Sequence, residues 1–217
     1  MTTQSLSAQL KDRRDDIEQQ LPSAAVNVMV KTTSELAESG IVDSSLKVGD
    51  QAPDFELPDP TGTQVKLSEL LKNGPVVINF YRGQWCPYCN LELRAFQRLL
   101  PEFRQADAQV IAISPELPDN SLSVKEKHDL AFPVLSDVGN VVAQKYGLVF
   151  TLASELRPLY KGLGIDIPAS NGDDTYELPV PATYVIDTSA TIRYAYANAD
   201  YTQRAEPAEV LAAVKSL

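Results

Sequence analysis

Hydrophobic residues change their spacing near residue 46, and this change divides the chain into two parts. Before residue 46, apolar positions recur at helical spacing opposite a charged stretch at 11–16, until Pro22 interrupts the pattern. A second helical stretch follows over 24–37, and Gly40 is placed as its C-terminal cap. We therefore expect a helical extension over residues 1–45, which either packs on the core or contacts a second subunit in a homodimer. The apolar positions of the first helix are Leu6, Leu10, Ile17 and Leu21.

After residue 46, short apolar segments alternate with turns, which is the pattern of strands. The segments 75–81 and 109–113 are almost entirely apolar, as expected for strands that are buried on both faces of a sheet. The connection between them has the length of a βαβ crossover, and it carries a helix that runs to about Arg104, with a kink expected at Pro101. Further strands are predicted at 52–57, 64–67, 183–187 and 191–195, and further helices at 122–130, 139–146 and 206–217. The segment 132–135 lies between two of these helices.

Residues 150–178 are less regular than the rest of the chain. The stretch 154–160 has helical character, but the glycines around it, Pro168 and the polar run 171–174 are typical of a loop. We expect an insertion here that borders the functional site. The pattern supports one domain over 46–217 and no second domain.

Composition restricts the classes of function. The chain has 217 residues, 44% of them hydrophobic, which is enough for a full core. Lys and Arg number 19 against 29 Asp and Glu, and the net charge of −10 argues against binding to nucleic acid or to anionic membranes. The apolar runs are far shorter than the roughly 20 residues of a membrane span, and the first residues lack a signal-peptide pattern. We therefore expect a cytoplasmic protein.

The candidate chemistry lies in Cys86 and Cys89, which come directly after the apolar segment 75–81. Positions three apart share a helix face, so the two sulfurs can form a disulfide with little backbone movement. Pro87 suits a first helical turn, which places Cys86 at a helix N-terminus, where the helix dipole favours the reactive thiolate. In a reducing cytosol such a pair is more often catalytic than structural.

Structural explanations of the cysteine pair are weaker. A disulfide that closes so short a loop constrains the unfolded chain little. A zinc site needs about four ligands, whereas the chain offers this pair and a single histidine, His128, which lies in a charged stretch and is expected to be solvated. We expect neither a metal nor another cofactor.

Three separated segments match motifs of a known family. They are 48–57, the segment 77–81 that leads into the cysteines, and 181–187. In this order and spacing they resemble the thioredoxin fold, and more closely its peroxiredoxin branch, the alkyl hydroperoxide reductase and thiol-specific antioxidant family. The resemblance covers roughly residues 46–217. It implies an α/β, thioredoxin-like fold with a central mixed sheet flanked by helices.

The chain departs from the peroxiredoxin motif Pro-x-x-x-Thr-x-x-Cys. Laid on this sequence, the motif puts its cysteine on Cys89, its threonine on Cys86 and its proline on Arg82. The family's arginine before the late strand falls at or beside Pro181, where thioredoxins carry a proline that usually follows a cis peptide bond. The chain thus resembles a subgroup that keeps a C-x-x-C pair, and we predict a cis Val180–Pro181 bond beside the cysteines.

The resemblance implies a thiol peroxidase that reduces hydrogen peroxide and organic hydroperoxides. Cys86 and Cys89 would cycle between dithiol and disulfide, with a thioredoxin or glutaredoxin type of protein as the electron donor. Two alternatives remain open. The first is a thiol-disulfide oxidoreductase that acts on protein disulfides through Cys86, and the second is a redox switch without enzymatic activity on a binding module.

Other residues near the pair receive supporting roles. Arg82 is expected to give positive charge to a thiolate or a bound peroxide, with a solvated side chain as the alternative. Glu92 matches an acidic residue that peroxiredoxins often carry three positions after the cysteine, with a surface glutamate as the alternative. Trp85 and Tyr88 are expected to form an apolar rim for partner docking, unless the core contains them. Arg204 is a further candidate, but no physical argument from the sequence places it at the site.

Overall fold

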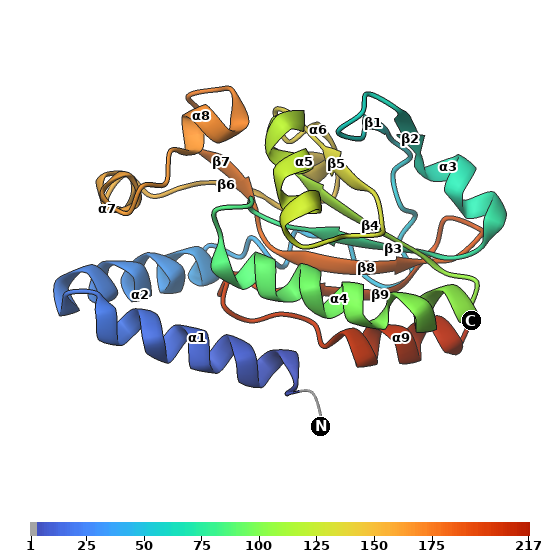
Figure 1. Ribbon diagram of the computed structural model, residues 1–217, viewed down its shortest axis with the longest axis horizontal. Helices are drawn as coiled ribbons and strands as arrows, with labels where there is room; N and C mark the ends of the chain where they lie inside the picture. The colour runs from blue at the N-terminus through green and yellow to red at the C-terminus, as the bar shows by residue number, and fades with distance from the viewer. Residues whose placement is uncertain (1–3) are drawn as a thin grey trace.

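A five-stranded mixed sheet forms the centre of the computed structural model, which describes residues 4–217 (Figure 1). The strand order is β5–β4–β3–β8–β9. Both β4 and β5 run parallel to β3, whereas β8 runs antiparallel to β3 and β9 antiparallel to β8. This confirms the α/β, thioredoxin-like architecture with a mixed sheet. The strands are β3 (Val76–Phe80), β4 (Gln109–Ser114), β5 (Val134–Ser136), β8 (Ala182–Ile186) and β9 (Ile192–Ala197).

The central strand β3 is buried on both faces, as its apolar run predicts. Alternate side chains enter two different cores, because successive residues of a strand point to opposite faces. Val77 packs in the core beneath α4 (Pro87–Gln105) and α9 (Pro207–Lys215), whereas Ile78 packs in the core on the other face. In Figure 1, α4 and α9 lie side by side across one face of the sheet. The sheet therefore holds the end of β3, where the cysteines follow, at the N-terminus of α4.

The N-terminal extension forms a helical hairpin of α1 (Leu6–Gln20) and α2 (Ser23–Glu38). Leu6 and Leu10 are buried in the core beneath α4, so the first helix packs on its own chain. A side chain near the C-terminus accepts hydrogen bonds from the free N–H groups at the start of α1. Glu206 accepts hydrogen bonds from the N–H groups of Leu6 (3.2 Å) and Ser7 (2.6 Å), and Ser5 accepts one from a further amide.

The segment 150–178 is more ordered than the loop that the sequence suggests. It contains the helices α7 (Leu156–Gly162) and α8 (Ile167–Asn171), and its ends pair as the antiparallel strands β6 (Val149–Thr151) and β7 (Glu177–Pro179). The segment has a small apolar core of its own. Its elements are short and rich in glycine and proline, so the sequence shows no periodic apolar pattern that would predict this core. The buried members of that core are Leu152, Leu156, Tyr160, Ile167 and Leu178.

The remaining elements agree with the predictions to within a few residues. Helix α5 (Pro118–Lys127) begins four residues earlier than expected, because Pro118 opens its first turn. The first strand begins four residues later than expected, at Glu56. Helix α4 continues through Pro101 to its end. Among the helices of residues 4–217, none combines the length and the apolar character that a bilayer span requires. The other elements are β1 (Glu56–Pro58), β2 (Gln64–Lys66), α3 (Leu67–Leu70), the 3₁₀ turn Leu71–Asn73 and α6 (Val141–Lys145).

Candidate active site

The two cysteines lie at the N-terminus of α4, where the sequence places them. Cys86 is the N-cap residue and Pro87 opens the helix, so Cys89 lies one turn inside. Both side chains are free thiols. Both are also fully buried, with 0% of their surface exposed. Residues of the N-terminal hairpin and of α7 cover this end of α4.

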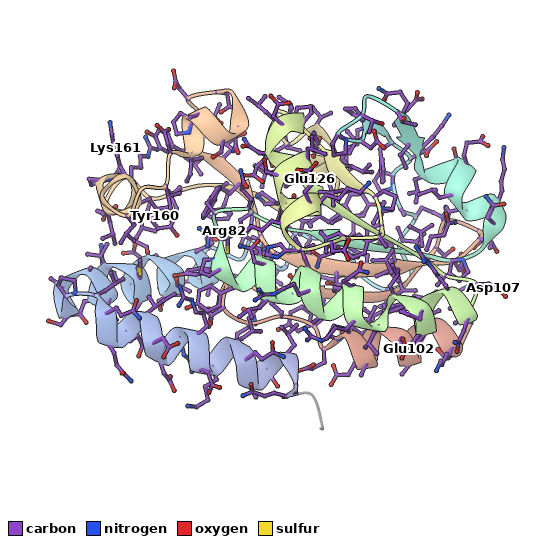
Figure 2. All side chains as sticks on the ribbon, in the orientation of Figure 1. Arg82, Glu102, Asp107, Glu126, Tyr160 and Lys161 are labelled. Carbon is purple, nitrogen blue, oxygen red and sulfur yellow. The ribbon has the colours of Figure 1, made fainter. Side chains whose placement is uncertain are left out.

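Arg82 is a buried residue and not the solvated side chain that was the alternative. Its Nη2 donates a hydrogen bond to the hydroxyl of Tyr160 at 2.7 Å. Figure 2 labels both residues, Arg82 in the loop between β3 and α4 and Tyr160 in α7. The guanidinium carbon lies 4.4 Å from the ring centre of Tyr201, 4.9 Å from that of Trp85 and 5.7 Å from that of Tyr160. Three aromatic rings thus hold the cation in place.

Arg204 is a candidate site residue that the sequence did not place. Its Nη2 lies 3.4 Å from the sulfur of Cys89, and its Nη1 pairs with the carboxylate of Glu92 at 2.5 Å. Two further hydrogen bonds to the carbonyl of Tyr201 fix the guanidinium. The arginine that peroxiredoxins carry near Pro181 is absent, and here a buried arginine reaches the site from the loop before α9. No local motif announces this contact, since 115 residues separate its two partners.

Glu92 is likewise a buried residue and not a surface glutamate. Its side chain and that of Arg204 are each 1% exposed, so the ion pair is shielded from water. Burial raises the pKa of Glu92 to about 7, although the charge of Arg204 and its hydrogen bond oppose this rise. The carboxylate holds Arg204 against the sulfur of Cys89.

The pKa values of the two thiols shift in opposite directions. Burial opposes ionisation of Cys86, but the hydrogen bond with Cys89 and the charges of Arg82 and Arg204 lower the Cys86 pKa to about 5. Burial and the hydrogen bond with Cys86 raise the pKa of Cys89 well above its usual value. These opposite shifts favour Cys86 over Cys89 as the thiol that ionises first. The charges of two buried guanidinium groups, Arg82 and Arg204, act on it.

Glu116 lies beneath the loop that precedes Cys86. Its Oε2 accepts a hydrogen bond from the Gln84 backbone at 2.8 Å, while Oε1 and the indole N–H of Trp85 have no partner among the described residues. Gly83 allows this arrangement, because its φ is 153° and a β-carbon there would lie 2.4 Å from the Trp85 nitrogen. Burial raises the pKa of Glu116 to about 8, so the side chain holds a proton at neutral pH.

A cavity of about 410 Å³ opens beside the dithiol. Cys86 lines it and Cys89 does not. Trp85 also lines it and is half-buried, whereas Tyr88 is 4% exposed and packs edge-to-face on Tyr201 at 5.6 Å between ring centres. The expected docking rim thus lies largely in the interior. The wall opposite Cys86 is apolar and is formed by Ile17, Leu21, Met29, Leu163 and Ile165.

Pro181 lacks the cis peptide bond that its resemblance to thioredoxin predicts. Among residues 4–217 every peptide bond is trans, so the predicted cis Val180–Pro181 bond is wrong. The chain passes in extended form from β7 into β8, and the N–H of Val180 donates to the Leu148 carbonyl at 2.8 Å. Pro181 lines a neighbouring cavity that it shares with Arg82. His128 lies just after α5 and outside the dithiol cavity.

Comparisons with known proteins agree with one another. The AhpC/TSA family profile matches residues 48–195. Chloroplastic peroxiredoxin Q of Oryza sativa subsp. japonica is 32% identical over 177 residues, which cover 82% of this chain and 70% of that protein. The crystal structure of peroxidoxin BcpB from Mycobacterium tuberculosis superposes with a TM-score of 0.63 at 28% identity, over 79% of this chain and 98% of that one. A peroxiredoxin-like protein from Aquifex aeolicus, 20% identical, has the same fold with a TM-score of 0.63, over 79% of this chain and 88% of that one.

Proposed function

Because the chain belongs to the AhpC/TSA family of peroxiredoxins and is thus a thiol peroxidase, we propose that Cys86 and Cys89 carry its redox cycle. The observation that supports this best is the buried dithiol between two guanidinium groups, Arg82 and Arg204. A thiolate is the attacking species in peroxide reduction, and buried positive charge stabilises it.

The cycle transfers two electrons from the sulfurs to the peroxide. The Cys86 thiolate attacks one peroxide oxygen, so an S–O bond forms as the O–O bond breaks. The departing oxygen takes up a proton and leaves as an alcohol or water. The Cys89 thiol then attacks the sulfenic sulfur of Cys86, which forms the disulfide and releases water. The cycle closes when two electrons and two protons return from a donor dithiol.

We assign the first attack to Cys86, although the peroxiredoxin motif aligns its reactive cysteine with Cys89. Cys86 lines the cavity through which a peroxide arrives, and it carries the negative charge of the pair. Cys89 lies one turn deeper and keeps its proton, as a resolving thiol should. In this scheme Arg82 stabilises the thiolate, while Glu92 and Arg204 position Cys89.

The electron donor in this proposal is a thioredoxin or glutaredoxin type of protein. The thioredoxin-like spacing of Cys86 and Cys89 supports a dithiol donor, because such donors exchange through mixed disulfides. Re-reduction then requires the covering side chains to move, since both sulfurs are fully buried. The alternative function, in which a folded protein disulfide is the oxidising substrate, would need the same movement in both halves of its cycle. A small peroxide needs no such movement to enter the cavity.

Two single substitutions test the order of the sulfurs. In Cys89→Ser, peroxide should oxidise Cys86 to one sulfenic acid per chain and turnover should stop there, because no thiol resolves it. In Cys86→Ser, peroxide consumption should fall by about 100-fold or more. A sulfenic-acid-specific probe with mass spectrometry measures the first result, and a coupled assay with thioredoxin, its reductase and NADPH measures the second.

The outcomes separate the possible explanations. A sulfenic acid on Cys89 in the Cys86→Ser variant would show that attack begins in the ordinary peroxiredoxin register. Peroxide consumption by the unaltered protein that is no faster than that of a free dithiol at equal concentration would overturn the proposed cycle as a whole.

A further inference from the structure

The cavity over Cys86 has an unusual charge for this protein. Its lining includes three cations, Arg13, Arg82 and Lys127, and no aspartate or glutamate. The protein as a whole has a net charge of −10, so this lining is opposite in sign to the average surface. The ion pairs of residues 4–217 include none of these three side chains. The cavity therefore favours an anion.

The three cations lie at different depths. Arg82 is buried beside the dithiol and, within the protein, has the Cys86 thiolate as its negative partner. Arg13 of α1 is half-buried, and Lys127 at the end of α5 is exposed, so these two lie at the rim. Both also line an adjoining groove on the other side of the rim residues. The acidic residues of α1 that come near, Asp12 and Asp16, line that groove and not the cavity.

Between the rim and the sulfur, the cavity wall is apolar. The N-terminal hairpin supplies Ile17 and Leu21 from α1 and Met29 from α2, and the segment after α7 supplies Leu163 and Ile165. A cavity of about 410 Å³ lies within the range that encloses small organic ligands and is far larger than hydrogen peroxide requires. An apolar wall of this kind stabilises a ligand in proportion to the apolar area that it covers.

We propose that this cavity selects hydroperoxides that carry both an apolar body and a carboxylate, and that Arg13 and Lys127 determine the preference. The inference rests on the proposed peroxidase function of the same site. The hydroperoxide group reaches Cys86, the apolar body lies along the wall, and the carboxylate meets the two rim cations. Arg13 and the hairpin part of the wall precede residue 48, where the match to the family begins, so this part of the specificity comes from the extension.

A matched pair of substrates isolates the charge. Linoleic acid hydroperoxide and its methyl ester have the same apolar body and the same peroxide, and they differ only in the carboxylate. With the unaltered protein, kcat/KM for the acid should exceed that for the ester by about tenfold, which corresponds to about 1.4 kcal/mol. The ratio should shrink as ionic strength rises, because the rim is open to solvent and salt screens it.

Substitutions at the rim then locate the effect. Arg13→Gln and Lys127→Gln should each lower the acid-to-ester ratio by about threefold, and the double variant should bring it close to one. The matched control is Arg14→Gln, which removes the same charge from the next position of α1 but lines a different cavity. It should keep the ratio of the unaltered protein. Because both substrates are measured on the same protein sample, partial loss of folded enzyme cancels from each ratio.

The results distinguish this inference from the function on which it rests. Equal kcat/KM for acid and ester in the unaltered protein would overturn the inference, as would a ratio that survives the double substitution. If hydrogen peroxide, the acid and the ester are all consumed no faster than by a free dithiol, the proposed function fails instead.

Discussion

Each sulfur of the dithiol has its own buried guanidinium. Arg204 contacts Cys89 and is neutralised by Glu92, which is equally buried. Arg82 has no carboxylate partner among residues 4–217, and its negative partner is the thiolate of Cys86. A buried cation without a counter-ion is costly, so Arg82 is stabilised when Cys86 is ionised. The interaction between Arg82 and the Cys86 thiolate therefore both lowers the pKa of Cys86 and offsets the cost of burying Arg82.

A buried acid near this pair should make stability depend on pH. The carboxyl of Glu116 loses its proton near pH 4.5 in the unfolded chain, but keeps it until about pH 8 in the folded protein. The folded state thus binds more protons across this window, and its stability falls as the pH rises. In Glu116→Gln this loss is absent, because the amide does not ionise and keeps an oxygen for the Gln84 amide.

The measurement is the free energy of unfolding in urea at several pH values. The stability of Glu116→Gln relative to the unaltered protein should increase between pH 4.5 and about 8, by more than about 1 kcal/mol, since one pKa unit corresponds to about 1.4 kcal/mol. Other titrating groups are common to both proteins and cancel from the difference. A constant difference across this window would show that Glu116 has an ordinary pKa.

The sequence predicts the positions of some residues at the site but not of others. The positions of Cys86, Pro87 and Cys89 follow from local spacing, because the start of a helix is set by its own few residues. The burial of Arg82 depends on aromatic rings that come from α7 and from the loop before α9. Arg204 reaches Cys89 only through the path of that loop. Contacts of this kind depend on tertiary structure and have no periodic signature.

At the scale of elements, α1 is fastened by a side chain from the other end of the protein. Glu206 precedes α9, yet its carboxylate makes no capping bond to that helix and instead accepts the N–H groups of Leu6 and Ser7. A negative charge at a helix N-terminus also interacts favourably with the helix dipole. The hairpin is thus tied to the loop that carries Arg204.

Removing this carboxylate should weaken the protein measurably. Glu206→Ala leaves amides at the start of α1 without an acceptor, and loss of such a cap typically costs about 1 kcal/mol. Urea unfolding followed by circular dichroism measures the change. The control is Glu18→Ala, an exposed acid near the other end of α1 that makes no ion pair among the described residues, which should alter stability by less than about 0.5 kcal/mol. Equal effects of the two substitutions would mean that the Glu206 contacts add nothing to stability.

In the segment 150–178, the spacing of apolar residues does not predict the helices that form. The helices α7 and α8 have 7 and 5 residues, too few for an apolar face to repeat. They are stabilised by packing on one another's apolar side chains, such as Tyr160 and Ile167, rather than by helix propensity. The segment borders the candidate site, because Tyr160 contacts both Arg82 and Trp85.

For the whole molecule, the central sheet was predictable, because continuous apolar runs mark strands that are buried on both faces. The two helices of the hairpin were also predictable from their periodicity. The place where the hairpin packs was not, since an amphipathic helix shows that it has a partner but does not show which one. In this fold the partner of α1 is α4, the helix that carries the cysteines.

Enclosure of both sulfurs by one chain predicts how the protein oxidises. The sequence contains no cysteine besides Cys86 and Cys89, and both are covered by the chain's own hairpin and α7. Mild peroxide treatment should therefore lower the mass of each chain by two hydrogens and leave it monomeric on a non-reducing gel. A disulfide-linked dimer as the main product would contradict this picture, because it would require the sulfurs to meet outside the fold.

The segment that identifies the family is shorter than the part of the chain that forms the site. The segment by which the family is recognised, 48–195, ends before Arg204 and begins after Arg13. A gene trimmed to that segment would encode the sulfurs without the arginine that contacts Cys89 and without one wall of their cavity. Conversely, a protein that shares only the segment with this one need not share its reactivity or its choice of substrate. For transfer of function between such proteins, the loop before α9 and the N-terminal hairpin have to be compared as well.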